Sequence, residues 1–271
     1  MLIEELNSHF ANTVLPAGVL RVLVACEESQ AVTKELRKLG HEAFSCDLLP
    51  ESGGHPEWHL QQDVTDLLKL KWDMIIAFPP CTYLTNAGMC NLTRKGATDE
   101  YRANRLRLRD EAMEFAKMIY NNDCPLIAIE NPVGYLSTGW RKPDQIIKPY
   151  EYGHSVNKKT CLWLKGLPKL QPTNIVDKDE ITIWEGTGKS ISKWYKETLK
   201  QGKGNLRKCQ ELEVRPLMEL QMLWLFSGRL TLAGNGWVYE QVCLAEIFKL
   251  PIPLMANLLI YLVTCSFCVL D

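Results

Sequence analysis

The chain has 271 residues, enough for one large α/β domain or for one domain with a smaller appendage. Its 31 Lys and Arg residues balance 32 Asp and Glu residues, so any nucleic-acid contact must come from a local patch rather than from an overall basic excess. The ten cysteines are scattered and form no disulfide framework, which favours a reducing, cytoplasmic setting.

The first part of the chain predicts a strand, a helix and a second strand. Residues 1–19 are treated as an N-terminal extension, and a strand is predicted over 20–26. Val32, Leu36 and Leu39 have the spacing of an amphipathic helix over 30–39, which Gly40 ends. A second strand over 41–46 leads directly to Asp47. His55 and His59 are expected to face solvent, because Pro56 between them favours a loop.

A third predicted strand, over 72–78, runs into two prolines and Cys81. The polar stretch 82–104 predicts a mobile loop over a site, and a helix is expected over 105–120. A fourth strand over 125–129 ends at Glu130 and Asn131. Alternating strands and helices predict an α/β domain over 20–175, with a mostly parallel sheet and helices on both faces.

Cys81 and Glu130 follow two strands of this sheet, and ligands of open α/β sheets bind beyond the carboxyl ends of strands. A thiolate beside a carboxylic acid suits covalent attack on an electron-poor ring such as a pyrimidine, with the acid protonating a ring nitrogen. The alternative is that Cys81 is a buried structural thiol and that Glu130 caps a helix or forms an ion pair.

These two segments resemble motifs of the DNA cytosine-5 methyltransferases. Phe78-Pro79-Pro80-Cys81 resembles the Pro-Cys nucleophile motif, and Ile129-Glu130-Asn131-Pro132 resembles the Glu-Asn motif. Together with 22–47, they are similar to a compact phage or prophage branch. The resemblance covers about residues 20–170 and implies a Rossmann-like methyltransferase fold. It also implies that Cys81 adds to C6 of cytosine while Glu130 holds N3, with Pro80 and Asn131 completing the catalytic group.

The resemblance implies S-adenosylmethionine as the cofactor. Asp47 would hold its ribose hydroxyls, and Asp63 would lie near its adenine amino group. The full set of expected cofactor-binding residues is Ala25, Cys26, Glu27, Ser29, Asp47, Leu48, Asp63, Val64 and Pro79. The turn after the first strand departs from the family pattern because it has no glycine.

DNA is the partner that the resemblance implies, for a protein expected to act as a monomer. The family's Gln-x-Arg-x-Arg stretch aligns with 152–160, where Lys158 and Lys159 stand in place of the arginines. A basic cluster follows Cys81, and its members are Arg94, Lys95, Arg102, Arg105, Arg107 and Arg109. Lys158, Arg94 and Lys95 are the residues expected to contact DNA. The cluster has an equally weighted alternative interpretation, as the solvated face of a helix.

No segment after 159 clearly forms a target-recognition domain, so two other functions stay open. One is an enzyme that uses the same thiol addition on a free pyrimidine nucleotide. The other is a non-catalytic binding protein that keeps the fold.

The C-terminal region, 176–271, predicts no clear fold. Residues 251–270 are uncharged, but their prolines and polar residues favour a buried terminal helix over a membrane span. No metal site is expected, since Cys265 and Cys268 form one CxxC without a second pair. A further hypothesis is a frameshifted tail, because codons for 208–224 read in another register can spell a sequence resembling the end of the phage branch.

Overall fold

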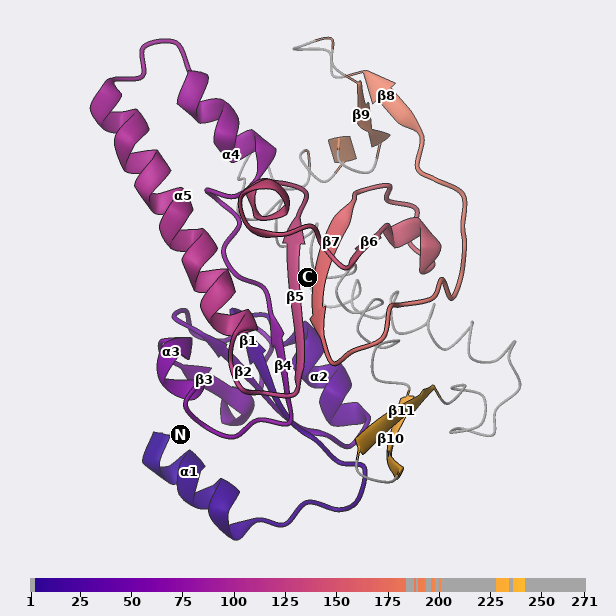
Figure 1. The fold of residues 1–271 in the computed structure, drawn as a ribbon. Helices are drawn as coiled ribbons and strands as arrows, with labels where there is room; N and C mark the ends of the chain where they lie inside the picture. The colour runs from indigo at the N-terminus through magenta and orange to yellow at the C-terminus, as the bar shows by residue number, and fades with distance from the viewer. Residues whose placement is uncertain are drawn as a thin grey trace.

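A seven-stranded sheet organises the chain. We describe residues 3–183, 188, 190–193, 196–197, 200, 228–233 and 236–241 of a computed structural model. The strands are β1 Arg21–Ala25, β2 Glu42–Asp47, β3 His59–Gln61, β4 Met74–Ala77, β5 Leu126–Pro132, β6 Gln145–Ile147 and β7 Thr160–Lys165. Their order is β3-β2-β1-β4-β5-β7-β6, and β7 runs antiparallel to both of its neighbours (Figure 1). The sheet is therefore mostly parallel, as predicted.

Helices and two small hairpins complete the described structure. The helices are α1 Ile3–Asn12, α2 Ala31–Lys38, α3 Val64–Leu67, α4 Asn86–Cys90 and α5 Asp99–Tyr120. The hairpins are formed by β8 Ile181–Ile183 with β9 Ser190–Ser192, and by β10 Gly228–Ala233 with β11 Gly236–Gln241. None of the described helices combines the length and the apolar character needed to cross a membrane.

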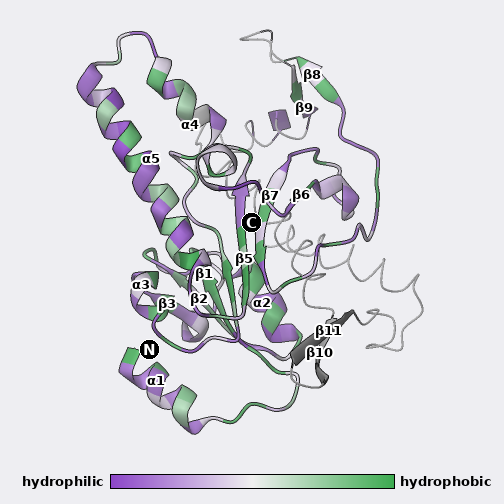
Figure 2. Ribbon diagram, in the orientation of Figure 1, coloured by the Kyte–Doolittle hydropathy of each residue, from purple (hydrophilic) through white to green (hydrophobic). Residues whose placement is uncertain are grey.

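Both faces of the sheet are buried under helices or loops. Successive side chains of a strand point to opposite faces, so Leu23 of β1 packs with residues of α1, α3 and α5 while Val24 packs with residues of α2. The central strands β1, β4 and β5 are accordingly mostly apolar (Figure 2). The predicted Rossmann-like fold, with helices on both faces, is confirmed.

The segment after Cys81 differs from the predicted loop. It contains α4 and a short 3₁₀ turn, Asn91–Thr93, and α5 begins at Asp99 rather than near 105. Thr98 caps α5, because its hydroxyl oxygen accepts the N–H of Tyr101 at 3.1 Å. Figure 1 shows that α4 and α5 form a helical hairpin alongside the carboxyl ends of β4 and β5.

The histidine expectation was wrong for His59, which is 7% exposed in β3. Its Nδ1 lies 2.9 Å from the Ser45 hydroxyl and its Nε2 lies 2.9 Å from the Leu49 carbonyl oxygen. His55 is half-buried and stacks on the Trp58 ring, with centroids 3.8 Å apart. The His59 side chain thus connects β3 to β2 and to the loop that follows β2.

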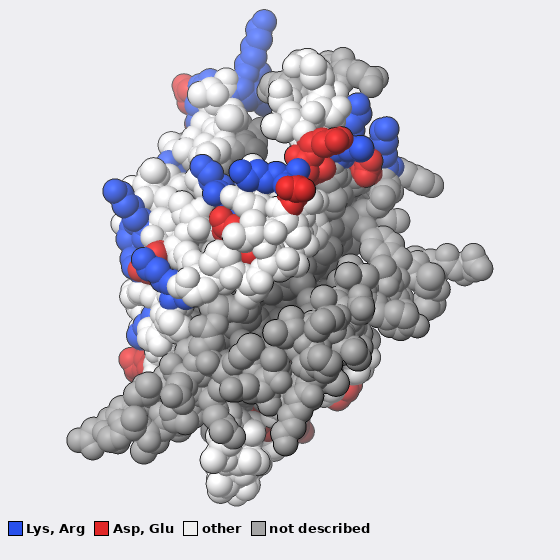
Figure 3. Space-filling view, turned by 90° about the vertical axis from the view of Figure 1, so that its right-hand side faces the viewer, with Lys and Arg blue, Asp and Glu red and all other residues white. Residues whose placement is uncertain are grey.

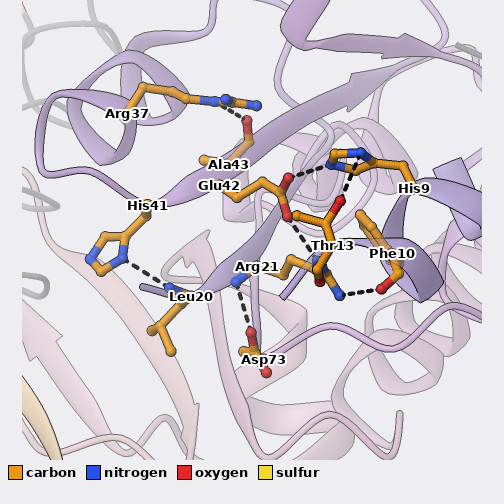
Figure 4. Close-up of polar contacts among 10 residues, drawn as sticks. All are labelled: His9, Phe10, Thr13, Leu20, Arg21, Arg37, His41, Glu42, Ala43 and Asp73. Carbon is orange, nitrogen blue, oxygen red and sulfur yellow. Dashed lines mark hydrogen bonds and ion pairs between the residues drawn. The ribbon is translucent and has the colours of Figure 1, made fainter. Parts of the chain in front are cut away.

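The N-terminal extension is joined to the domain at the amino ends of the strands. Leu6 of α1 is completely buried in the core that contains Leu23. The Arg21 guanidinium donates to the Glu42 carboxylate at 2.7 Å and to the carbonyl oxygens of Phe10 and Thr13 at 3.1 and 2.7 Å (Figure 4). Residues 3–19 of the extension therefore contribute to the packing of the domain.

Several predictions for the tail lie outside the described residues. They are the terminal helix over 251–270, the CxxC pair Cys265 and Cys268, and the frameshift hypothesis for 208–224. Among the residues that the structure describes, no group of three or more His, Cys, Asp or Glu side chains could hold a metal ion.

Candidate functional site

The two motif segments leave the sheet at the same edge. β4 and β5 are parallel neighbours, and Ala77 at the end of β4 pairs with Ile129 of β5. Cys81 therefore follows β4 where Glu130 and Asn131 continue β5. The topology brings the predicted nucleophile and acid to one place, as expected for the carboxyl edge of a parallel sheet.

Asn131 joins the two motifs directly. Its side chain is 1% exposed, and its Nδ2 donates a hydrogen bond of 2.8 Å to the Pro79 carbonyl oxygen. A second connection lies farther along, where the Tyr135 N–H donates to the Leu84 carbonyl oxygen at 2.6 Å. Thr85 and Gly134 form a β-bridge beside it. The segment carrying Cys81 is thus fastened at both ends to the segment that follows Glu130.

Cys81 begins a tight turn. Its carbonyl oxygen accepts the N–H groups of Leu84 and Thr85 at 2.9 and 3.1 Å. Pro79 before it is buried and Pro80 is exposed, while Cys81 itself is half-buried. Cys81 is therefore not the fully buried structural thiol of the alternative interpretation, whereas Cys161 nearby is completely buried.

Burial raises the pKa of Glu130 to about 7, although the nearby positive charge of Lys158 acts in the opposite direction. Lys158 reaches this place because β7 runs antiparallel to β5, so that Thr160 pairs with Pro132 and the residues before β7 lie at the edge formed by the carboxyl ends of the parallel strands. Of the three residues expected to contact the substrate, Lys158 is the one that the structure places beside Glu130.

The turn after β1 adopts an unusual backbone without using glycine. Cys26 has φ 62°, in the left-handed region that favours glycine. Glu27, 3% exposed, accepts the N–H of Val32 at 2.6 Å with one oxygen and the Thr33 hydroxyl at 2.6 Å with the other. Burial raises the pKa of Glu27 to about 7, despite the opposing hydrogen bonds from Thr33 and Val32. The Glu27 carboxylate thus holds the start of α2, and the Glu27 N–H donates to the Cys46 carbonyl oxygen at 3.0 Å, so neither group is available for the expected contact with a cofactor.

Two of the predicted acidic residues lie close to Cys26. Burial raises the pKa of the Cys26 thiol to about 12, and the charges of Asp47 and Asp63 add to this rise. Asp63 caps α3 by accepting the Thr65 N–H at 2.8 Å, and hydrogen bonds from the Thr65 side chain and backbone lower its pKa. The predicted cofactor residues of β1, β2 and the start of α3 thus gather at one end of the sheet.

The other expected cofactor-binding residues differ in how exposed their side chains are. Leu48 is 71% exposed next to Asp47 and presents an apolar side chain, and Ser29 is half-buried. Ala25 and Val64 are in the apolar core, so their side chains face neighbouring residues. The carboxylates of Asp47 and Asp63 and the exposed Leu48 fit a nucleoside with hydroxyl and amino donors and an apolar ring.

The sequence interpretation missed a segment that packs on this turn. Gln30, with φ 56° and no exposed surface, donates through Nε2 to the His55 carbonyl oxygen at 2.7 Å and accepts the His55 N–H at 3.0 Å. A Cβ atom on Gly53 would lie 2.5 Å from the Ser29 carbonyl oxygen, so only glycine fits there. The Gly53-Gly54 pair was the signal of this close approach.

Apart from Arg105, the basic cluster after Cys81 separates into two kinds of residue. Arg94 and Lys95 are exposed at the connection between the 3₁₀ turn and α5. Arg102, Arg107 and Arg109 form ion pairs with Asp99, Glu111 and Asp110. Basic and acidic side chains are also interspersed over the described surface seen in Figure 3.

Comparisons with known proteins identify similar solved structures. No protein-family model matches this chain, and neither does any curated protein. The S. pombe Dnmt2 methyltransferase is 15% identical with a TM-score of 0.38, over 55% of this chain and 51% of that chain. The Entamoeba histolytica methyltransferase EhMeth is 14% identical with a TM-score of 0.40, over 68% of this chain and 66% of that chain. This chain therefore spans about half the length of the first structure and less than two thirds of the second.

Proposed function

We propose that the chain is an S-adenosylmethionine-dependent methyltransferase that modifies C5 of cytosine in DNA through a covalent bond between Cys81 and C6. The observation that carries the proposal is the joint between the two motifs at neighbouring strand ends. Asn131 beside Glu130 holds the carbonyl of Pro79, two residues before Cys81. A half-buried thiol and a carboxyl with a pKa of about 7 therefore belong to one fixed unit.

The residues of this unit can divide the chemistry between them. The Cys81 thiolate forms a bond to C6 of the ring, and the electron pair of the C5–C6 bond moves toward C5 and N3. Glu130, protonated near neutral pH, donates to N3 and stabilises the charge that develops there. After C5 is methylated, a base such as water takes the C5 proton, its electron pair re-forms the C5–C6 double bond, the thiolate leaves C6, and N3 returns its proton to Glu130.

Asp47, Asp63 and Leu48 are the residues proposed to hold S-adenosylmethionine, together with the backbone of the turn from Ala25 to Ser29. When bound, the cofactor supplies the electrophilic methyl group. The gathering of both carboxylates around Cys26 supports this assignment. Pro79 and Val64, both buried, shape the surrounding structure.

DNA is the proposed substrate, with Lys158 near the reacting base and Arg94 and Lys95 on its phosphates. The interaction of Lys158 with Glu130 supports the first assignment. The exposure of Arg94 and Lys95 in the connection between the 3₁₀ turn and α5 supports the second.

The test is incubation with labelled S-adenosylmethionine and unmethylated duplex DNA, comparing the native chain with Cys81→Ser. Label should enter C5 of cytosine with the native chain and not with the variant. Label transfer that survives the substitution would overturn the covalent mechanism. Transfer to deoxycytidine monophosphate in place of the duplex would assign the free nucleotide as substrate. If calorimetry shows no binding of S-adenosylmethionine at millimolar cofactor, the non-catalytic binding protein that keeps the fold would be the remaining function.

A further inference from the structure

Two arginines of α5 contact the segments that follow the two motifs. The Arg105 guanidinium lies 4.9 Å from the centre of the Tyr83 ring, and its Nη2 donates to the Gly88 carbonyl oxygen at 3.0 Å. The Arg109 guanidinium lies 3.9 Å from the centre of the Tyr135 ring. Tyr83 is two residues after Cys81, and Tyr135 is five residues after Glu130.

These contacts converge because of the helical spacing. Arg105 and Arg109 are four residues apart, so they lie on the same side of α5. The segments they hold also touch each other, through the hydrogen bond from the Tyr135 N–H to the Leu84 carbonyl oxygen. One helix therefore braces the turn after Cys81 and the turn after Glu130 together.

α5 is itself fixed to the sheet. Its residues Met113, Ala116 and Ile119 are buried in the core with the strands. The half of the helix that carries Arg105 extends from this buried half as one continuous helix of 22 residues. A rigid element anchored in the core is suited to setting the position of a reactive side chain.

The Arg105 contact uses two properties that only arginine combines. Its planar guanidinium can lie against an aromatic ring while its N–H groups donate to a carbonyl oxygen. The accepting residue is held closely, since a Cβ atom on Gly88 would lie 2.4 Å from the Thr82 carbonyl oxygen. The guanidinium thus connects Tyr83 and Gly88 on either side of the Thr85 cap of α4.

We propose that Arg105 is a positioning residue, which acts through Tyr83 to hold the Cys81 thiol in line with C6 of the target base. Arg109 does the same for the segment after Glu130, through Tyr135. This inference rests on the proposed function. It gives Arg105 a role inside the protein, in place of the phosphate contact considered for the basic cluster.

The test measures the rate at which Cys81 becomes bonded to DNA. The substrate is a duplex of several hundred base pairs in which 5-fluorocytosine replaces cytosine, incubated with S-adenosylmethionine. After methyl transfer C5 carries fluorine in place of a proton, so elimination of the thiolate is blocked and the adduct accumulates. Arg105→Ala and Arg105→Lys should both slow adduct formation by about 10- to 100-fold, the size expected for a misplaced reacting group. Tyr83→Leu should reproduce this loss, and Tyr83→Phe should keep the native rate because it keeps the ring.

Lys117→Ala is the matched control. It removes a positive charge from the same helix, where Lys117 pairs with Glu114 at 2.7 Å, and it should leave the rate unchanged. Reversible DNA binding is measured separately in a Cys81→Ser background, in which Arg105→Ala should change neither the dissociation constant nor its salt dependence.

The outcomes separate the two proposals. A native chain that forms no adduct with this duplex would contradict the proposed function. A native chain that forms the adduct while Arg105→Ala forms it equally fast would overturn the positioning role alone. Weaker DNA binding by the Arg105→Ala variant, restored by lysine, would assign Arg105 to a phosphate instead.

Discussion

The surroundings of Glu130 control whether it carries a proton. Burial disfavours the charged form, the nearby Lys158 favours it, and the balance raises the pKa to about 7 from the ordinary 4.5. The carboxyl is thus a proton donor on the acidic side of neutrality and an anion on the alkaline side. In the proposed reaction electron density moves toward N3 of the ring, so the protonated form of Glu130, which can donate to N3, is the form required.

Methyl transfer should therefore fall as pH rises through about 7, when the Glu130 proton is lost. Glu130→Gln keeps an N–H donor that does not titrate, so the variant should be slower but should lack this decrease. The measurement is the rate of label transfer under saturating cofactor between pH 5.5 and 8.5. Glu114→Gln, which changes an exposed carboxyl of α5, should retain the native profile. A native profile without any decrease near pH 7 would count against Glu130 as the proton donor.

The same raised pKa makes the stability of the fold depend on pH. Because the folded-state pKa lies above the ordinary value, Glu130 stabilises the fold fully below about pH 4.5, and this contribution is lost as pH rises through about 7. Glu130→Gln should therefore be more stable relative to the native chain at pH 8 than at pH 5. Urea denaturation at both pH values measures the difference. An equal effect at both values would contradict the raised pKa.

Asn131→Ala should slow methyl transfer even under conditions in which the variant remains folded. The substitution removes the hydrogen bond to Pro79 and should lower the free energy of unfolding by about 1–2 kcal/mol. Asn122→Ala is the control, since Asn122 also donates through Nδ2 to a carbonyl oxygen, that of Leu68, at 2.7 Å, and its Oδ1 accepts the Cys124 N–H at 2.9 Å. Asn122→Ala should lose at least as much stability in denaturation as Asn131→Ala, but only Asn131→Ala should lose activity. Equal activities would show that the joint does not position Cys81.

At the scale of elements, the turn after β1 adopts a left-handed conformation although it contains no glycine. Cys26 takes a left-handed conformation, which strains a residue with a Cβ atom by about 1–2 kcal/mol. The Glu27 carboxylate offsets this by capping the following helix with hydrogen bonds from Val32 and Thr33. Buried hydrogen bonds therefore stabilise the left-handed backbone of this turn, a conformation that a glycine would adopt without strain.

Cys26→Gly and Cys26→Ala separate the strain from the thiol. Both remove sulfur, but only glycine relieves the left-handed conformation, so Cys26→Gly should be more stable than Cys26→Ala by up to about 1 kcal/mol. Both should still bind S-adenosylmethionine, since Asp47 and Asp63 are unchanged. Denaturation and calorimetry measure the two effects. A glycine variant no more stable than the alanine variant would mean that the turn is not strained.

The sequence predicted those elements whose apolar pattern is long enough to recognise. The strands before Cys81 and Glu130 are apolar runs, and α2 has a clear apolar spacing. β3 and β6 have only three residues each, too few for a pattern. The start of α5 was missed because the buried residues of the helix begin only at Met113, so its first half lacks an apolar stripe.

The convergence of Cys81 and Glu130 at one edge of the sheet is the part of the candidate site that position along the chain decides. Cys81 and Glu130 follow strands, and parallel strands bring such residues together. The capping role of Glu27 and the brace of Arg105 on Tyr83 depend on which side chains meet after packing. No local pattern carries that information, because the partners come from separate segments or from within a turn whose backbone was not predictable.

At the scale of the whole molecule, the two ends of the sheet differ in what they hold. The carboxyl ends carry the candidate site, whereas the amino ends are closed by α1 and by the contacts of Arg21 (Figure 4). His9 of α1 lies 2.5 Å from the Glu42 carboxylate, and Phe10 packs edge-on against Trp72. α1 therefore belongs to the same cooperative unit as the sheet.

Leu6→Ala should lower the free energy of unfolding by about 3 kcal/mol, because Leu6 is completely buried in the main core. The loss should appear as a shift of one single transition in denaturation. Val14→Ala, at a residue that is 94% exposed, should cause no measurable change. A separate early transition for the N-terminal segment, with the main midpoint unmoved, would show that residues 1–19 fold apart from the domain.

The Asn131 hydrogen bond to Pro79 also constrains how this protein can diverge. The two residues are 52 positions apart in the chain, yet one side chain and one backbone oxygen must keep a fixed separation. An insertion or deletion between Pro79 and Cys81 would move the thiol relative to Glu130 even if every catalytic residue were kept. Descendants of this chain should therefore inherit the two motifs as a pair. In those that lose Asn131, the segment that carries the thiol should also vary in length through insertions and deletions.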